Sequence, residues 1–342
     1  MPSNNGTAGR SFWSDHSVLV TGAGGFVGSW LTASLVRSGA RVVAILRDSP
    51  GETLLRKQGV SSEVTVIQGS ITDYRLVERA LNKYEVDSCF HLAAQAIVSA
   101  ANRSPVSTFE DNIQGAWTVL EACRLTPAVK RIVVASSDKA YGDQPVLPYT
   151  EATPLSGRYP YDASKVCTDV LAGCYAATYD LPIAVARCAN IYGGADLNWS
   201  RLIPGTIRSV LFGEEPIIRS DGSPERDYLY VTDAIRAYMA LGMRAADADT
   251  RGRAFNFGRG IPISALDLVE RILAVANSSL RPRILGDARG EIERQYLDSS
   301  LARNFLGWEP EVTLDDGLPE TLDWYAEYLQ APRPLAITAG AR

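Results

Sequence analysis

The sequence predicts an α/β protein in which a doubly wound parallel sheet is interleaved with a smaller α/β domain toward the C-terminus. Short apolar, β-branched runs alternate with helical patterns through the first two-thirds of the 342 residues. This order is typical of a parallel sheet covered by helices on both faces. A glycine-rich turn, TGAGGFVG, joins the first strand to the first helix, and the alternation loosens after residue 192. Together these features are typical of a Rossmann fold followed by a second, smaller domain.

The strands of the large sheet are expected in order along the chain. Six apolar runs predict them, at residues 17–22, 40–46, 64–70, 87–94, 131–137 and 183–193. The helix FVGSWLTASLVRSG starts directly after the glycine-rich turn and closes at Gly39. LYVTDAIRAYMAL predicts a further helix, and AFNFG predicts a last strand that returns to the sheet.

The predicted domains interleave along the chain. Residues 13–191 and 229–258 are expected to form a dinucleotide-binding domain, and residues 192–228 with 259–330 a substrate-binding domain. The last residues, 331–342, are rich in Pro, Ala and Gly and predict a flexible tail.

Composition excludes several classes of function. The net charge of −5 gives no basic surface for a nucleic-acid partner. No apolar run is long enough to span a bilayer, and the first residues lack the features of a secretory signal, so a cytoplasmic protein is expected. The five cysteines are spread out without a CxxC motif, and the only histidines are His16 and His91, so no metal site is expected.

The glycine-rich turn predicts a nucleotide cofactor. Gly22, Gly25 and Gly28 lie between a strand and a helix, where glycines let the backbone approach a pyrophosphate at the helix N-terminus. The alternative is a turn without a ligand. At the end of the second strand, Arg47 can pair with the 2′-phosphate of NADP, which favours NADP over NAD. The alternative there is a solvated pair of Arg47 with Asp48.

Five motifs in register carry a family resemblance: TGAGGFVG, HLAAQ (91–95), SSDKAYG (136–142), YPYDASK (159–165) and RDYLYVTD (226–233). With them the chain resembles the extended short-chain dehydrogenase/reductase family, from Val18 to about Tyr328. Within that family it looks most like the nucleotide-sugar 4,6-dehydratases. The adjacent Asp138 and Lys139, GSWL (28–31) and NIYGGADLNWSRLIPGTIRS (190–209) resemble the CDP-glucose 4,6-dehydratase branch.

The resemblance implies a tightly bound NAD(P)⁺ and a set of residues that contact it. They are Gly22, Gly25, Phe26, Val27, Gly28, Arg47, Ser70, Ile71, Leu92, Ala93, Ala94, Gln95, Tyr161 and Lys165. One position departs from the family pattern. The chain has Gly69-Ser70 where the family often has Gly-Asp near the adenine, although a hydroxyl can still accept a hydrogen bond. His91 is expected to be a packed core histidine near the cofactor.

Tyr161 and Lys165 are the predicted centre of oxidation. Their spacing of four residues puts them on one helix face, and Pro160 suits a helix start. The ammonium of Lys165 and the nicotinamide charge are expected to lower the pKa of Tyr161, so that its phenolate can take a hydroxyl proton. Ser137 is expected to hold the same hydroxyl. The alternative is a surface helix with an exposed lysine.

The pair Asp138 and Lys139 predicts an elimination that follows the oxidation. Oxidation at C4 of a sugar makes the C5 proton acidic, and loss of that proton with the C6 hydroxyl needs a base and an acid. By resemblance, Asp138 would protonate the leaving hydroxyl and Lys139 would take the C5 proton. Asp138 must then be protonated through burial, and Lys139 must be neutral. The alternative is an exposed, salt-bridged loop pair.

The resemblance also implies a substrate site and an assembly. Asn190, Arg201 and Arg226 are candidates for the diphosphate and nucleotide of a sugar nucleotide, with a plain surface arginine as the alternative for Arg201. CDP-glucose is favoured, and GDP- and UDP-sugars stay open. A homodimer is expected through helices near 107–124 and 162–179. Two other functions stay open: a 4-epimerase on the same fold that leaves Asp138 and Lys139 idle, and a non-catalytic NADP-binding regulator.

Overall fold

A computed structural model describes residues 11–47, 54–287 and 292–330 of the chain. The tail predicted to be flexible and Asp48 lie outside the described residues. None of the helices in these ranges combines the length and apolarity needed to cross a lipid bilayer.

The larger of the sheets has seven strands, all paired in parallel, in the order β3, β2, β1, β4, β5, β6, β10. Their bounds are β1 Ser17–Thr21, β2 Arg41–Leu46, β3 Val64–Gln68, β4 Ser88–His91, β5 Arg131–Ala135, β6 Ile183–Cys188 and β10 Ala254–Phe257. The predicted doubly wound parallel sheet is confirmed, including the return of the late AFNFG strand to the edge beside β6.

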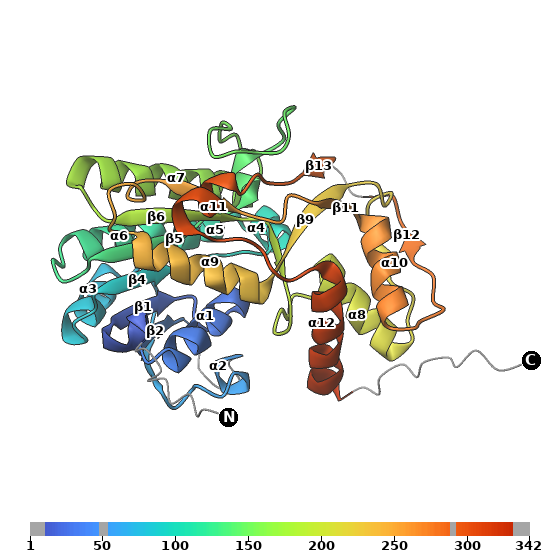
Figure 1. Ribbon diagram of the computed structural model, residues 1–342, viewed down its shortest axis with the longest axis horizontal. Helices are drawn as coiled ribbons and strands as arrows, with labels where there is room; N and C mark the ends of the chain where they lie inside the picture. Colours follow the sequence, from blue (N-terminus) through green and yellow to red (C-terminus); the bar gives the residue numbers. More distant parts are fainter. Residues whose placement is uncertain (1–10, 48–53, 288–291, 331–342) are drawn as a thin grey trace, which may run out of the picture.

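Apolar side chains of this sheet alternate between two cores, one on each face. Val18 and Val20 pack with α1 (Phe26–Arg37) and α9 (Val231–Arg244), which lie side by side over one face (Figure 1). Leu19 points the other way and packs with the second core. That core is covered by α3 (Tyr74–Lys83), α6 (Gly115–Arg124) and α7 (Pro160–Tyr179). Because both faces are buried, the strands read as continuous apolar runs in the sequence.

Short elements complete this part of the chain. They are a 3₁₀ turn Phe12–Asp15, α2 Leu54–Lys57, α4 Val98–Arg103, α5 Pro105–Phe109, a π-helical turn Glu110–Gln114 and a 3₁₀ turn Asp138–Tyr141. The π-helical turn links α5 to α6 without a break, so residues 105–124 form one long, locally widened helix.

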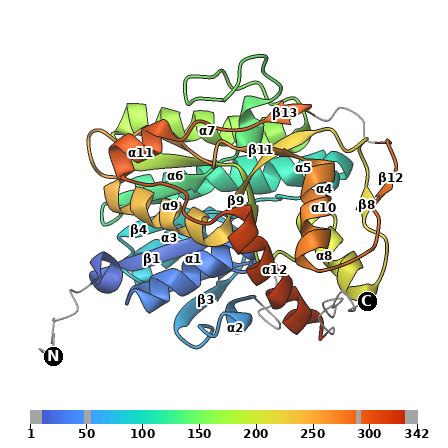
Figure 2. The same cartoon turned by 45° about the vertical axis from the view of Figure 1, so that its right-hand side comes forward.

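A smaller part of the chain stands at one end of the large sheet (Figure 1), and Figure 2 turns it forward. Its four-stranded sheet contains β7 Asn190–Tyr192, β9 Glu225–Tyr230, β11 Pro262–Ser264 and β13 Arg294–Gln295. The pair β8 Ile217–Ile218 and β12 Arg283–Ile284 lies at its outer edge. Its helices are α8 Leu202–Phe212, α10 Ala265–Val275 and α12 Leu314–Leu329, while α11 Ser300–Leu306 packs back against β10 and α9.

The single strand predicted at 183–193 is wrong. The chain forms β6, leaves the large sheet at Ala189, and continues as β7, which pairs with β9 of the smaller sheet. Both halves are apolar, so the sequence pattern does not reveal the change of sheet. The predicted boundaries at 191 and 228 fall inside β7 and β9, and the division into two domains stays a prediction.

Candidate active site

Two adjoining cavities open at the carboxyl ends of the strands of the large sheet. One has a volume of about 600 Å³ and the other about 450 Å³. They share a wall made of Phe26, Val27, Leu92, Ala94, Ala96 and Arg201. The strand order reverses between β1 and β4, and ligands of open α/β sheets bind at such a point.

The glycine-rich turn lines the smaller cavity and has no room for a side chain at Gly22 or Gly28. Gly22 has φ +77°, and a Cβ there would lie 2.7 Å from the backbone nitrogen of Ala93. A Cβ on Gly28 would lie 2.0 Å from the carbonyl oxygen of Gly22. The turn therefore leaves backbone groups and the start of α1 facing the cavity, which fits the pyrophosphate of a dinucleotide.

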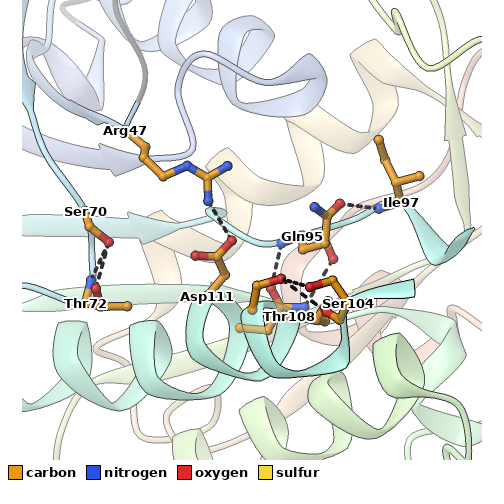
Figure 3. Close-up of polar contacts among 10 residues, drawn as sticks. Arg47, Ser70, Thr72, Gln95, Ile97, Ser104, Thr108 and Asp111 are labelled. Carbon is orange, nitrogen blue, oxygen red and sulfur yellow. Dashed lines mark hydrogen bonds and ion pairs between the residues drawn. The ribbon is translucent and has the colours of Figure 1, made fainter. Parts of the chain in front are cut away.

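Most predicted cofactor residues line these cavities. Those on the smaller one are Gly22, Gly25, Phe26, Val27, Gly28, Arg47, Ser70, Ile71, Leu92, Ala93 and Ala94, and Tyr161 and Lys165 are on the larger one. Gln95 lines neither. Its backbone nitrogen donates to Asn112 Oδ1 at 2.6 Å, and its side chain accepts from the nitrogen of Ile97 at 3.1 Å. Figure 3 shows this local role of Gln95.

Arg47 reaches across the smaller cavity to a residue that the sequence analysis missed. Its guanidinium donates to Asp111 Oδ2 at 2.7 Å (Figure 3), and both residues line the cavity. Asp111 lies 64 positions away on the π-helical turn, so no local motif connects the two. Ser70 also lines the cavity, and its hydroxyl is 2.8 Å from that of Thr72.

All five predicted catalytic residues line the larger cavity: Ser137, Asp138, Lys139, Tyr161 and Lys165. Tyr161 and Lys165 lie on the first turns of α7, which starts at Pro160 as predicted. Lys165 Nζ donates to the carbonyl oxygen of Ala135 at 2.8 Å and lies 5.9 Å from the centre of the Tyr161 ring. The sheet end and the helix start therefore bring these groups together.

Burial shifts the pKa values of Tyr161 and Lys165. It raises the pKa of Tyr161 to about 12, and the hydrogen bond with Ser137 and the charge of Arg201 oppose the shift only in part. It lowers the pKa of Lys165 to about 8. The prediction that Lys165 and the nicotinamide charge together lower the pKa of Tyr161 stays a prediction; for the chain by itself, desolvation of the phenolate outweighs the charge of Arg201.

Asp138 is buried, with 2% of its surface exposed, so the alternative of an exposed loop pair does not hold for it. Its Oδ1 accepts from the hydroxyl of Ser137 at 3.0 Å, while its Oδ2 is buried with no hydrogen-bond partner among the described residues. Lys139 is half-buried, and its Nζ donates to Oε1 of Gln295 from β13. Gln295 was missed because it comes 156 positions later.

A second carboxyl group lies beside this pair. Asp162 follows Tyr161 on α7 and is buried. Burial raises its pKa to about 6; the charge of Lys139 opposes that shift and the charge of Asp138 adds to it. Its place inside the motif YPYDASK was the available signal in the sequence.

A buried polar network holds the loop of residues 136–142 from behind. The hydroxyl of Ser136 donates to Asp169, whose carboxylate also pairs with Arg187 at 2.7 Å. Arg187 donates to the hydroxyl of Tyr141 at 2.9 Å, and that hydroxyl donates to Asn256 at 2.6 Å. The network joins the loop to α7, β6 and β10.

The predicted substrate residues divide into two groups. Arg201 lines both cavities and pairs with the buried Asp196 at 2.8 Å, and Asn190 lines the larger cavity. Arg226 lines neither, and its guanidinium donates to the carbonyl oxygen of Glu225 at 2.8 Å. Further polar residues missed by the sequence analysis line the larger cavity: Asp196, Asn198, Ser200, Arg219 and Tyr228.

His91 is the packed core histidine that was predicted. It is buried at the end of β4, and its Nδ1 lies 2.8 Å from the hydroxyl of Thr21. Burial lowers its pKa to about 3, so the ring is neutral. The described residues contain no group of three or more His, Cys, Asp or Glu that could hold a metal ion.

Comparison with known proteins gives a consistent family. The family model described as GDP-mannose 4,6 dehydratase matches residues 19–321. The dTDP-glucose 4,6-dehydratase of Xanthomonas campestris is 32% identical, over 90% of this chain and 92% of that protein. The UDP-glucose 4-epimerase of Mycolicibacterium smegmatis is 30% identical, over 90% of this chain and 97% of that protein. The CDP-glucose 4,6-dehydratase of Salmonella typhimurium is 27% identical, over 94% and 93%.

The fold is also shared with solved structures of such enzymes. The dTDP-glucose 4,6-dehydratase of Bacillus anthracis in complex with NAD aligns with a TM-score of 0.82 and 26% identity, over 92% of this chain and 98% of that one. The predicted resemblance to nucleotide-sugar 4,6-dehydratases, and with it an enzyme of the sugar-nucleotide dehydratase class, is confirmed. The nucleotides named for the relatives differ, so the specificity for CDP stays a prediction.

Proposed function

Because the chain belongs to the GDP-mannose 4,6 dehydratase family, we propose that it converts a nucleotide-diphosphate sugar into its 4-keto-6-deoxy form by removing water. One observation carries the proposal. The three residues proposed for oxidation and the Asp138–Lys139 pair line the same cavity, and that cavity adjoins the one lined by the glycine-rich turn. An epimerase needs the first three groups and has no use for a buried carboxyl beside an amine.

The first half of the proposed reaction uses Tyr161, Ser137 and Lys165. Bound nicotinamide supplies the acceptor for the hydride that leaves C4 and the donor that later returns it to C6. Tyr161 takes the proton of the C4 hydroxyl. The hydroxyl of Ser137 holds that sugar hydroxyl in place by a hydrogen bond. The pKa of Tyr161 is about 12 even with the opposing charge of Arg201, so its action as a phenolate would need the further positive charge that a bound nicotinamide ring would supply.

The second half uses the pair in the 136–142 loop. Lys139 takes the proton from C5, the electron pair forms the C5–C6 double bond, and the C6 hydroxyl leaves as water with a proton from Asp138. The buried Oδ2 of Asp138 is the oxygen suited to carry that proton, since it has no hydrogen-bond donor among the described residues. Return of hydride to C6 and of a proton to C5 gives the product.

Substitution of the pair tests this division. Asp138→Asn and Lys139→Met keep the approximate shape of each side chain and remove its proton chemistry. Each should slow formation of the dehydrated product by about 10²–10⁴. Both variants should still reduce the bound cofactor on mixing with substrate, so the absorbance of reduced nicotinamide rises and persists. Formation of the dehydrated product at the parental rate would show that the pair does not carry out the elimination. A parent and variants that all form only a C4 epimer would favour the epimerase, and loss of cofactor reduction would show that the pair positions substrate for oxidation.

The nucleotide and the cofactor are separate parts of the proposal. CDP-glucose is the proposed substrate by resemblance, and a panel of CDP-, dTDP-, GDP- and UDP-sugars assayed by mass for the loss of one water tests it.

NADP is the favoured cofactor because Arg47 lines the smaller cavity, although Asp111 already neutralises part of the charge of Arg47. A non-catalytic regulator would need neither Tyr161 nor the buried Asp138.

A homodimer is the proposed assembly. The predicted helices expose large apolar side chains, among them Trp117 (41% exposed), Val170 (61%) and Tyr179 (50%). Apolar side chains gathered on neighbouring helices are typical of a protein interface. Light scattering of the purified chain tests this proposal, and a monomer would contradict it.

A further inference from the structure

Gln295 is the one residue of the smaller sheet that hydrogen-bonds to both Asp138 and Lys139 among the described residues. It lies on β13, which pairs in parallel with β9, and its side chain is fully buried. Its Nε2 donates to the carbonyl oxygen of Asp138 at 2.9 Å, and its Oε1 accepts from Nζ of Lys139. Both ends of one amide are thus used by two consecutive residues of the active loop.

The backbone that follows Gln295 is hydrogen-bonded to Tyr149. The backbone nitrogen of Tyr149 donates to the carbonyl oxygen of Tyr296 at 3.0 Å. The backbone nitrogen of Asp298 donates to the carbonyl oxygen of Tyr149 at 2.9 Å. Residues 149 and 297 also form a parallel bridge. These contacts, together with the pairing of β13 with β9, hold the backbone from which the Gln295 side chain reaches the loop.

The chemistry of a side-chain amide suits this place. A side-chain amide offers a donor and an acceptor on two separate atoms without a charge, whereas a carboxylate lacks the donor and a lysine or arginine lacks the acceptor. A neutral carbonyl oxygen can accept from Lys139 whether that residue is an amine or an ammonium. A carboxylate there would favour the ammonium, which cannot act as a base.

We infer that Gln295 is a positioning residue for the elimination step, aiming the amine of Lys139 while it fixes the backbone of Asp138. This inference rests on the proposed function. It assigns to the smaller part of the chain a role in proton transfer, in addition to its expected role in binding the nucleotide. The oxidation of C4 depends on Tyr161 and Lys165, which Gln295 does not contact in the described hydrogen bonds.

The test compares two variants of Gln295 in the holoenzyme. Gln295→Met removes both hydrogen bonds at similar volume, and Gln295→Glu keeps the shape and adds a charge. In Gln295→Met, formation of product and uptake of solvent deuterium at C5 should each slow by about tenfold or more, while the rate of cofactor reduction stays close to the parent. In Gln295→Glu, the pH at which elimination becomes fast should move upward, because the carboxylate holds Lys139 as the ammonium.

Matched controls separate positioning from stability. Gln144→Met and Gln144→Glu alter a glutamine that donates to Tyr141 and Ser156 near the same loop and lines neither cavity, and both should behave as the parent. In the Lys139→Met background, Gln295→Met should add less loss than it causes in the parent, because only the hydrogen bond to Asp138 remains to be removed.

Several results would overturn the inference. Equal slowing of cofactor reduction and product formation in Gln295→Met would make Gln295 a structural residue, and so would an unshifted pH profile in Gln295→Glu. Unfolding of both variants, seen by thermal melting, would do the same. If the parent enzyme forms no dehydrated product, the proposed function itself fails, which is a different outcome from a parent that dehydrates at the same rate as the Gln295 variants.

Discussion

The two walls of the active site are built in opposite ways. The cofactor wall is made by the absence of side chains: Gly22 and Gly28 bring backbone within a distance that any Cβ would block. The catalytic wall is made by side chains that hold one another: Ser136, Asp169, Arg187 and Tyr141 form a buried network behind the loop. The first wall thus depends on a few neighbouring residues, and the second depends on contacts between distant parts of the chain.

Replacement of Tyr161 should have the largest effect, because it should lower turnover and leave cofactor binding unchanged. Tyr161→Phe removes the phenolic oxygen and little volume, so turnover should fall by about 10²–10⁴ while cofactor binding is kept. Turnover and the amount of nicotinamide carried by the purified protein are the measurements. Tyr179→Phe, at the exposed end of the same helix, is the control and should match the parent. Retention of more than a few per cent of turnover in Tyr161→Phe would place the base elsewhere.

Loss of the buried ion pair between Arg187 and Asp169 behind the catalytic wall should lower the free energy of unfolding. Arg187→Met leaves the carboxylate of Asp169 buried and unpaired, and should reduce the free energy of unfolding by about 3–5 kcal/mol, measured by urea denaturation. Arg251→Met breaks an exposed ion pair with Asp180 and should change it by about 0–1 kcal/mol. Similar losses in both variants would mean that burial of the Arg187 pair does not matter.

A single methyl group at Gly28 should be enough to displace the glycine-rich turn and weaken cofactor binding. Gly28→Ala places a Cβ against the carbonyl of Gly22, so the turn must shift, at about 1–3 kcal/mol in stability. The purified variant should carry much less nicotinamide than the parent. Gly173→Ala lies on α7 where a Cβ meets nothing within 4 Å, and it should be neutral or slightly stabilising. A parental cofactor content in Gly28→Ala would show that the turn does not contact the pyrophosphate.

The smallest expected effect concerns the choice of cofactor. Arg47→Ala should weaken binding of NADP more than NAD, by about 1–3 kcal/mol. Asp111→Asn should do the reverse and improve NADP by a few-fold, since an exposed ion pair contributes about 0–1 kcal/mol. Dissociation constants for both cofactors measure this, and equal changes for NAD and NADP would exclude a contact of Arg47 with a 2′-phosphate.

The same contrast explains what could be predicted from the sequence. The strand, the glycine turn and α1 are consecutive, and Tyr161 and Lys165 are one helical turn apart, so local patterns were sufficient. Asp111 and Gln295 reach the site only through the packing of helices and sheets that are far apart in the chain. The raised pKa of Tyr161 was missed for a related reason, because burial is a property of the assembled site and outweighs the neighbouring charges.

The late position of Gln295 has a consequence for synthesis of the protein on the ribosome. The glycine turn and its flanking elements emerge within the first fifty residues, and most of the large sheet follows before β10 closes its edge at residues 254–257. The hydrogen bond between Lys139 and Gln295 needs a residue 156 positions downstream of Lys139, close to the end of the described chain. The glycine-rich turn and its flanking elements are therefore synthesised long before the side chain that hydrogen-bonds to Asp138 and Lys139 in the 136–142 loop.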